Sequence, residues 1–272
     1  MSQRPGRHHD DLVRRAQDAL DREDFNEAEA LGRRALMLDP ESLDARGVVA
    51  AALIEQLRYE EAVVLLDELL AKDPDDLVAL TDLGLARFEL CEFEKAEAAL
   101  SRALEIDNTD PQGLYWMALC LERHGEYELA ERYFERAHQH GPEDYPLPAR
   151  TTPADFEATL RGALAELPED IRREIKNLKI IVDDLPREQD LTDFEPPLDP
   201  CLYGLYVGVP LPDRTTADAP RLPDNIYIYK RNLERMCSDL ETLREEIRIT
   251  LLHEIGHYLG FDEDDLAERG LA

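Results

Sequence analysis

The chain has 272 residues, of which 61 are acidic and 31 are lysine or arginine, so its net charge is −30. This surplus of negative charge argues against DNA or RNA as a ligand, because nucleic-acid binding needs a basic surface. With 43% hydrophobic and 34% charged residues, the composition is that of a folded, soluble protein large enough for two modest cores.

The N-terminus has no apolar stretch after its basic residues, as a signal peptide would, and no window of about 18 apolar residues occurs. We therefore expect a cytoplasmic protein without a membrane span. The four cysteines, Cys91, Cys120, Cys201 and Cys237, form no C-x-x-C pair, which argues against a disulfide framework and a cysteine-based zinc ribbon.

The first half of the chain repeats a pattern every 34 residues. Three columns of the pattern are Phe25, Tyr59, Phe93 and Tyr127; Ala28, Ala62, Ala96 and Ala130; and Pro40, Pro74, Asn108 and Pro142. Small residues at fixed positions let two antiparallel helices approach closely, and a proline ends the second helix. The period therefore predicts four helix pairs, each of which buries its apolar face against the next.

These residues resemble the tetratricopeptide repeat, of which residues 9–142 would hold four copies. The resemblance implies an all-α, right-handed solenoid whose concave surface binds a peptide or another protein. The alternative is that the solenoid is only a scaffold for the rest of the chain. Nothing in the sequence identifies a partner.

Residues 143–152 are rich in proline, show no periodicity and are predicted to be a linker. From 153 to 272 the patterns predict an α+β domain. Its expected elements are two helices before residue 178, strands over 178–182, 201–211 and 225–233, and a long helix from residue 240. We expect Ser238 or Asp239 to cap this last helix and Gly260 to end it.

The last predicted helix contains the string HEIGH at 253–257. Two histidines four residues apart lie on one face of a helix, so both imidazoles can bind one metal ion, and imidazole nitrogen suits Zn²⁺. Glu254 then lies beside the metal, where its carboxylate can take a proton from a bound water. We predict His253 and His257 as zinc ligands and Glu254 as the catalytic base. A metal-free helix with two partly exposed histidines is the alternative.

The longer string from His253 to Glu263, H-E-x-x-H-x-x-G-x-x-E, resembles the metzincin signature with glutamate where those enzymes usually have histidine. Because a carboxylate is an acceptable zinc ligand, Glu263 is the predicted third ligand. Asp264, or none of the neighbouring acids, remains the alternative, and the other acids would begin a following helix. Metzincins also carry a methionine turn downstream, and none of the nine residues after Glu263 is methionine.

The segments at 201–211, 222–237 and 242–266 are similar to the bacterial minimal zincin-like metallopeptidases, over residues 153–272. The resemblance implies a compact zincin-like fold with its metal site on the last long helix. The first hypothesis is a zinc-dependent metallopeptidase whose repeats recruit a protein substrate. The alternative is a non-catalytic interaction adaptor with a degenerate zincin-like domain.

A peptide substrate of such an enzyme would pair with an exposed strand edge, for which residues 226–230 are the candidate. Tyr203, Tyr206 and Tyr258 are candidate oxyanion donors, without a positional argument for any of them.

Overall fold

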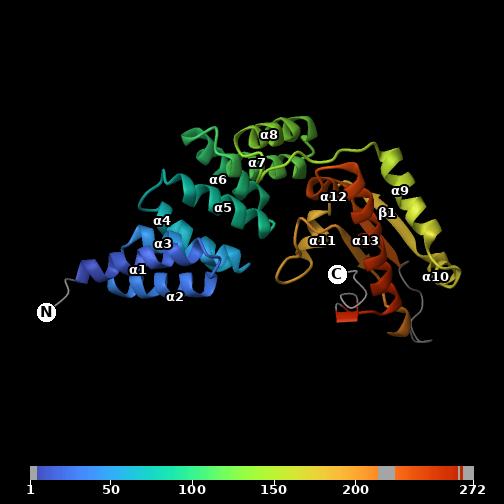
Figure 1. Cartoon of the computed structure of the whole chain (residues 1–272), viewed down its shortest axis with the longest axis horizontal. Helices are drawn as coiled ribbons and strands as arrows, with labels where there is room; N and C mark the ends of the chain where they lie inside the picture. Colours follow the sequence, from blue (N-terminus) through green and yellow to red (C-terminus); the bar gives the residue numbers. More distant parts are fainter. Residues whose placement is uncertain (1–4, 214–223, 263, 266–272) are drawn as a thin grey trace. The chain divides into compact units, whose positions relative to one another are not determined.

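The structure is a computed structural model, shown in Figure 1, and it describes residues 5–213, 224–262, 264 and 265. The contacts within the chain divide it into two compact units, residues 1–145 and residues 146–272. The first unit is helical, whereas the second combines helices with a three-stranded sheet. This arrangement confirms the predicted fold class of a helical solenoid followed by an α+β domain.

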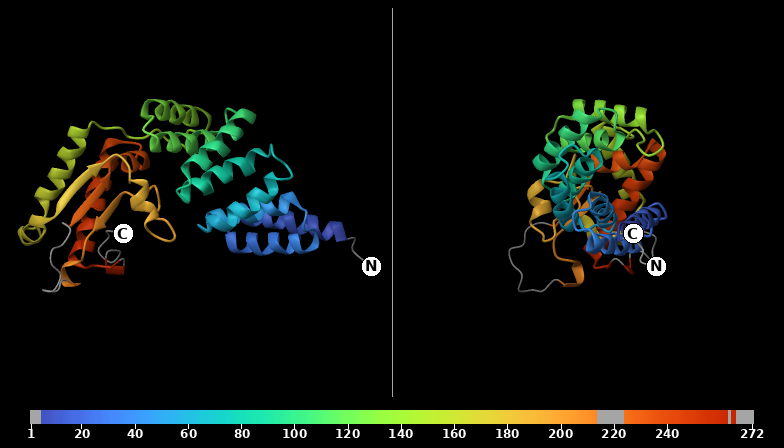
Figure 2. Two further views of the ribbon diagram at one scale, coloured as in Figure 1. Left: turned by 180° about the vertical axis from the view of Figure 1, so that it is seen from behind. Right: turned by 90° about the vertical axis from the view of Figure 1, so that its left-hand side faces the viewer.

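The first unit is built from helix pairs, and Figure 2 shows them from two further sides. The helices are α1 (Pro5–Leu20), α2 (Phe25–Leu38), α3 (Leu43–Glu55), α4 (Tyr59–Leu70), α5 (Leu77–Glu89), α6 (Phe93–Ile106), α7 (Pro111–Arg123) and α8 (Tyr127–His140). Each helix packs against the next one along the chain. Helices α2 and α8 end two residues before Pro40 and Pro142, because proline cannot continue a helix without losing a hydrogen bond.

The alanine column of the repeat lies entirely inside the first unit. Its members, Ala28, Ala62, Ala96 and Ala130, each have 0% of their surface exposed. A larger side chain at these positions would push the helices of a pair apart, and overpacking a core costs typically about 1–3 kcal/mol. The 34-residue period in the sequence is therefore the period of close helix contacts.

A left-handed residue joins the two helices of every pair. Glu23, Leu57, Cys91 and Gly125 stand 34 residues apart and have φ angles of 60°, 59°, 58° and 75°. Only Gly125 adopts this conformation freely, because a residue with a Cβ atom in the left-handed region loses roughly 1–2 kcal/mol of stability. These turns could not be predicted from the sequence, because three of the four positions lack the glycine that would mark them.

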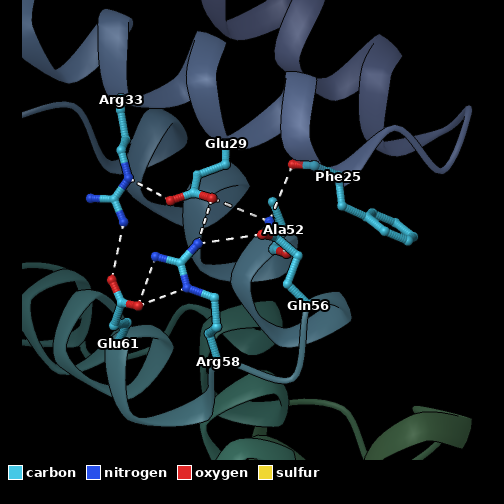
Figure 3. Close-up of polar contacts among 7 residues, drawn as sticks. All are labelled: Phe25, Glu29, Arg33, Ala52, Gln56, Arg58 and Glu61. Atoms are coloured by element: carbon cyan, nitrogen blue, oxygen red, sulfur yellow. Dashed lines mark hydrogen bonds and ion pairs between the residues drawn. The ribbon is translucent and has the colours of Figure 1, made fainter.

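Charged side chains connect the first two repeats, as Figure 3 shows. Glu29 of α2 accepts hydrogen bonds from Arg33 at 2.7 Å and from Arg58, in the next repeat, at 2.7 Å. Gln56 donates to the same carboxylate at 3.3 Å. Burial raises the pKa of Glu29, but these three donors outweigh it and hold the pKa below its usual value.

Replacing Glu29 by glutamine is expected to lower the free energy of unfolding of the solenoid by about 1–2 kcal/mol at neutral pH. Because the pKa is depressed in the folded state, the contribution is complete above the unfolded value of about 4.3 and disappears as the pH falls below it. Trp116 is the sole tryptophan and lies in α7, so its fluorescence during urea unfolding reports on this unit. Glu60→Gln, an exposed carboxylate on α4, is the matched control, and an equal loss in both variants would contradict the prediction.

The second unit places its sheet beside one long helix. Its elements are α9 (Pro153–Glu166), α10 (Glu169–Glu174), a 3-10 turn (Ile175–Asn177), β1 (Lys179–Asp183), α11 (Glu188–Thr192), β2 (Gly204–Val207), a 3-10 turn (Leu211–Asp213), β3 (Asn225–Tyr229), α12 (Lys230–Met236) and α13 (Leu240–Leu259). The strand order is β1-β3-β2, with β3 parallel to β1 and antiparallel to β2. The three predicted strand regions are confirmed, although β2 is shorter than the predicted range 201–211.

Two predictions about residues 225–233 are wrong. Strand β3 is the central strand of the sheet, so residues 226–230 offer no free edge to a substrate. The alternation of isoleucine and tyrosine indicated a buried face but carried no information about strand order. The strand also ends at Tyr229, because residues 230–236 turn into α12, where Lys230 pairs at 2.6 Å with the buried Glu234 one turn later.

No helix in the described part of the chain combines the length and the apolar character that crossing a membrane requires.

Candidate metal centre

The candidate site lies on the C-terminal half of α13, whose ends are as predicted. Asp239 caps the helix by accepting hydrogen bonds from the backbone of Glu241 at 2.8 Å and of Thr242 at 2.9 Å. Gly260, with a φ of 93°, ends it. One stripe of the helix is buried in the core of the unit, and its members are Leu243, Ile247, Leu251, Ile255 and Tyr258. This stripe fixes the rotation of the helix and leaves His253 and His257 half-buried on another face.

The two histidines converge on one point. The Nε2 atoms of His253 and His257 lie 2.9 Å apart, with ring centroids 4.6 Å apart and ring planes at 83°. Two nitrogen ligands of one tetrahedral zinc ion, each about 2.1 Å from the metal, lie about 3.4 Å apart. The rings therefore need to separate by only about half an ångström to share a zinc ion. This arrangement fits a metal and differs from that of two unrelated surface histidines.

The backbone after the helix orients the second ring. The Nδ1 atom of His257 lies 3.3 Å from the carbonyl oxygen of Phe261, and the amide of Phe261 donates to the carbonyl of Gly256 at 3.0 Å. When Nδ1 carries the proton and donates it to this carbonyl, the lone pair of Nε2 is available to a metal. The glycine turn at 260 thus supplies an outer contact of the kind that metal-binding histidines have.

Glu254 lies with the histidines on the wall of a cavity of about 310 Å³. Only 6% of its surface is exposed. The other lining residues come from β2 and the loop before it, and they are Leu198, Asp199, Leu202, Gly204, Leu205 and Tyr206. A larger cavity of about 1070 Å³ lies between α9 and the N-terminal half of α13, and none of the motif residues lines it. The smaller cavity is the chemically relevant one, because, unlike the larger cavity, it is lined by an acid and two convergent imidazoles.

Strand β2 approaches α13 so closely that Gly204 leaves no room for a side chain. A Cβ atom at this position would lie 2.8 Å from Oε1 of Glu254 and 2.9 Å from Cγ2 of Thr250. Real Cβ contacts are not this short, so the glycine is what allows the strand to lie beside the acid.

Replacing Gly204 by alanine is therefore expected to destabilise the second unit by about 1–3 kcal/mol and to displace the Glu254 carboxylate. Calorimetry of the whole chain measures the loss of stability. Gly162→Ala is the matched control, because a Cβ there meets no atom within 4 Å and α9 gains a better helix former. The prediction is contradicted if both variants unfold at or above the wild-type temperature.

The predicted third ligand, Glu263, lies outside the described residues. Among the residues that are described, no three His, Cys, Asp or Glu side chains are grouped so as to hold a metal ion, so Asp264 does not join the two histidines. Asp262 and Asp265 have another role, because Asp262 accepts from the amide of Asp265 at 2.9 Å and Asp265 accepts from the amide of Asp262 at 3.4 Å. This reciprocal pattern is a capping box, which is the capping role that was predicted for the acids beside Glu263.

The three candidate oxyanion donors differ in position. Tyr206 lines the cavity, and its hydroxyl donates to Asp224 at 3.0 Å. Tyr258 is buried, with its hydroxyl donating to the carbonyl of Glu174 at 3.0 Å. Tyr203 does not line the cavity, although it directly precedes Gly204.

Comparisons with known families agree with both halves of this description. The model of the zincin-like metallopeptidases matches residues 175–271. Models of the tetratricopeptide repeat match residues 19–83, 53–120 and 111–144. The chain carries tetratricopeptide repeats and a zincin-like metallopeptidase domain. The resemblance to both families in the sequence is thereby confirmed.

Several solved structures are similar to about half of this chain. MamA from Desulfovibrio magneticus, solved from its residue 41 onward, is 21% identical, with a TM-score of 0.45, and the match covers 48% of this chain and 75% of that one. The thermophilic repeat protein TTC0263 of Thermus thermophilus is 24% identical, with a TM-score of 0.43 and coverages of 49% and 74%. No curated protein matches the chain.

Proposed function

We infer that the chain is a zinc-dependent peptidase, in which the zincin-like domain cleaves a polypeptide and the repeats recruit it. The observation that carries this inference is the convergence of the Nε2 atoms of His253 and His257 to 2.9 Å beside the enclosed carboxylate of Glu254. Glu263 completes the proposed ligand set.

Each residue of the site has a separate part in the proposed reaction. Zinc bound by His253, His257 and Glu263 would supply a Lewis acid that polarises the peptide carbonyl and lowers the pKa of a bound water to about 7. Glu254 takes the proton of the attacking water at its carboxylate and returns it to the leaving amine. Only 6% of the surface of Glu254 is exposed, and this low contact with bulk water strengthens the electrostatic interactions of its carboxylate.

Strand β2 is the proposed edge for the substrate. It pairs with β3 on one side only, and among the described strands none pairs with its other side. Gly204, Leu205 and Tyr206 of this strand line the cavity. An extended peptide that adds to this edge is held by main-chain hydrogen bonds, with its scissile bond directed to the histidines.

Metal content and cleavage test this proposal together. We expect the purified chain to bind one zinc ion and to cleave a mixed peptide library, and a chelator to abolish both. Replacing His253 and His257 by alanine should remove the zinc, whereas His140→Ala, an exposed histidine on α8, should not. A chain that binds zinc but cleaves no peptide would support the adaptor alternative, and zinc binding that survives the double replacement would refute the assigned ligands.

A further inference from the structure

The first helices of successive repeats form the inner face of the solenoid. Helix α1 contacts α3, α3 contacts α5 and α5 contacts α7, in addition to the contacts within each pair. Helices that contact their counterparts in the neighbouring repeat lie on the inside of the curve, so a ligand on this face meets several repeats at once. The charged and aromatic residues along α5 and α7 therefore decide what this face can bind.

Asp82, in the middle of α5, is an acid without a counter-charge. It is half-buried, and it has neither a hydrogen-bond nor an ion-pair partner among the described residues. Burial is the main cause that raises its pKa to about 7, and the negative charges of Asp76, Glu55 and Asp110 raise it further. An unpaired acid whose ionised form is disfavoured by the surrounding protein is a candidate binding position.

Two of its three acidic neighbours are already engaged. Asp76 accepts from the amide of Ala79 at 2.9 Å as the cap of α5. Asp110 accepts from the amide of Gly113 at 2.8 Å as the cap of α7, and from the hydroxyl of Thr81 at 3.2 Å. The two capping carboxylates make the electrostatic potential around Asp82 more negative. Their hydrogen bonds to the helix backbone hold them in place, so they are not free to bind a ligand. Asp82 is thus the carboxylate that remains available to an incoming group, with the exposed Glu55 on α3 as its neighbour.

Apolar and aromatic side chains flank Asp82. Val78, one turn before it on α5, is 68% exposed, and Leu85, about one turn after it, is half-buried. Trp116 is half-buried on α7 and packs edge-on against Phe88 of α5, with ring centroids 5.4 Å apart. Phe88 is six residues after Asp82, so the indole of Trp116 lies about 9 Å from Asp82 along the axis of α5.

A metal ion does not account for this combination, because no three acids in the described part of the chain are grouped to hold one. The carboxylate of Asp82 can pair with a cation. The exposed valine and the tryptophan can contact apolar groups on either side of that cation. A lysine or arginine side chain in a polypeptide offers both, since an extended peptide places neighbouring side chains about 3.3 Å apart along its length. The net charge of −30 also steers basic partners toward the chain.

We propose that the inner face of α5 and α7 binds an extended segment of a partner protein whose lysine or arginine pairs with Asp82, while flanking apolar residues contact Val78 and Trp116. This deepens the recruitment role proposed above, because it names the chemistry of the recruited segment. It does not depend on zinc or on cleavage, so it can hold for a chain that proves to be an adaptor.

Fluorescence of the full chain tests the proposal directly, because Trp116 is its sole tryptophan. The probe is an acetylated, amidated peptide with one lysine between leucines, compared with the same peptide carrying norleucine or glutamate in place of lysine. We expect the lysine peptide to change the fluorescence and to bind at least about tenfold more tightly than the norleucine peptide, a difference of about 1.4 kcal/mol. Spermine, a cation without apolar side chains, is expected to bind more weakly than the peptide.

Asp82→Asn separates the pairing from unfolding, because removing an unpaired acid is not expected to destabilise the solenoid. This variant should bind the lysine peptide about tenfold more weakly and the norleucine peptide as before. Glu60→Gln makes the same charge change on the exposed surface of α4 and should leave both affinities unchanged. Equal lysine and norleucine affinities, no binding at about 1 mM, no effect of Asp82→Asn, or spermine binding as tight as the peptide would each overturn the proposal.

Discussion

Glu254→Gln is expected to lower the rate of peptide cleavage by about 10²–10⁴-fold, because the amide cannot take the proton of the attacking water. The amide is nearly the same size as the carboxylate, so the crowded contact between Glu254 and Gly204 remains. Zinc content should stay at the wild-type level, since the proposed ligands are His253, His257 and Glu263. The measurement is kcat/KM on a peptide selected from the library, together with elemental analysis of the same sample.

Glu241→Gln is the matched control for this experiment. It makes the same change on the first turn of α13, about 20 Å along the helix from Glu254, where the carboxylate is exposed. Its rate of cleavage should equal that of the wild type. Equal cleavage by the wild type and Glu254→Gln would mean that a contaminant or another residue performs the reaction. That result would refute the assignment of Glu254 as the catalytic base.

Local spacing made part of the candidate site predictable. A separation of four residues on a helix places His253 and His257 on one face, whatever surrounds the helix. Asp199, Gly204 and Leu205 could not be predicted in the same way, because they reach the site through the packing of β2 and the loop before it near α13. The one local signal was Gly204 within a strand, since glycine there often marks a close approach of another group.

The same distinction explains what could be predicted of the fold. Repeated close contacts between neighbouring helices require small residues at a constant interval, so the period in the sequence revealed the helix pairs. The order of the strands depends on pairings between residues 179–183, 204–207 and 225–229, which are distant in the sequence. Alternating side chains indicate a buried face but leave open whether a strand is central, and for this reason residues 226–230 were wrongly predicted to be an edge.

Asp82 connects the stability of the solenoid to its proposed role. Residues that destabilise the free protein are expected at functional positions, because binding of a ligand there can relieve the destabilisation. The solenoid tolerates a half-buried carboxylate next to three further acids, although a neutral side chain of the same shape would avoid the repulsion. A partner that supplies a cation would relieve this repulsion on binding, whereas a neutral or acidic segment would not. The repulsion therefore contributes to selectivity for basic segments.

The stability of the free chain should reveal this cost. The pKa of Asp82 is about 7 when folded and about 3.9 when unfolded, so between these values the folded state holds a proton that the unfolded state has lost. Stability therefore falls as the pH rises from about 4 to about 7, and the loss is complete above that range. Asparagine does not titrate, so Asp82→Asn should be about 1–2 kcal/mol more stable than the wild type at pH 8, allowing for partial exposure of the carboxylate.

At pH 4 the two proteins should unfold at nearly the same urea concentration, because Asp82 is then protonated in the folded state. Tryptophan fluorescence again follows the solenoid alone, and Glu60→Gln should show no comparable dependence on pH. A difference that is independent of pH would mean that the side chain acts through shape or hydrogen bonding and not through its charge. A wild type more stable than Asp82→Asn at pH 8 would mean that the carboxylate already has a favourable partner, and the argument for a cation at this position would fail.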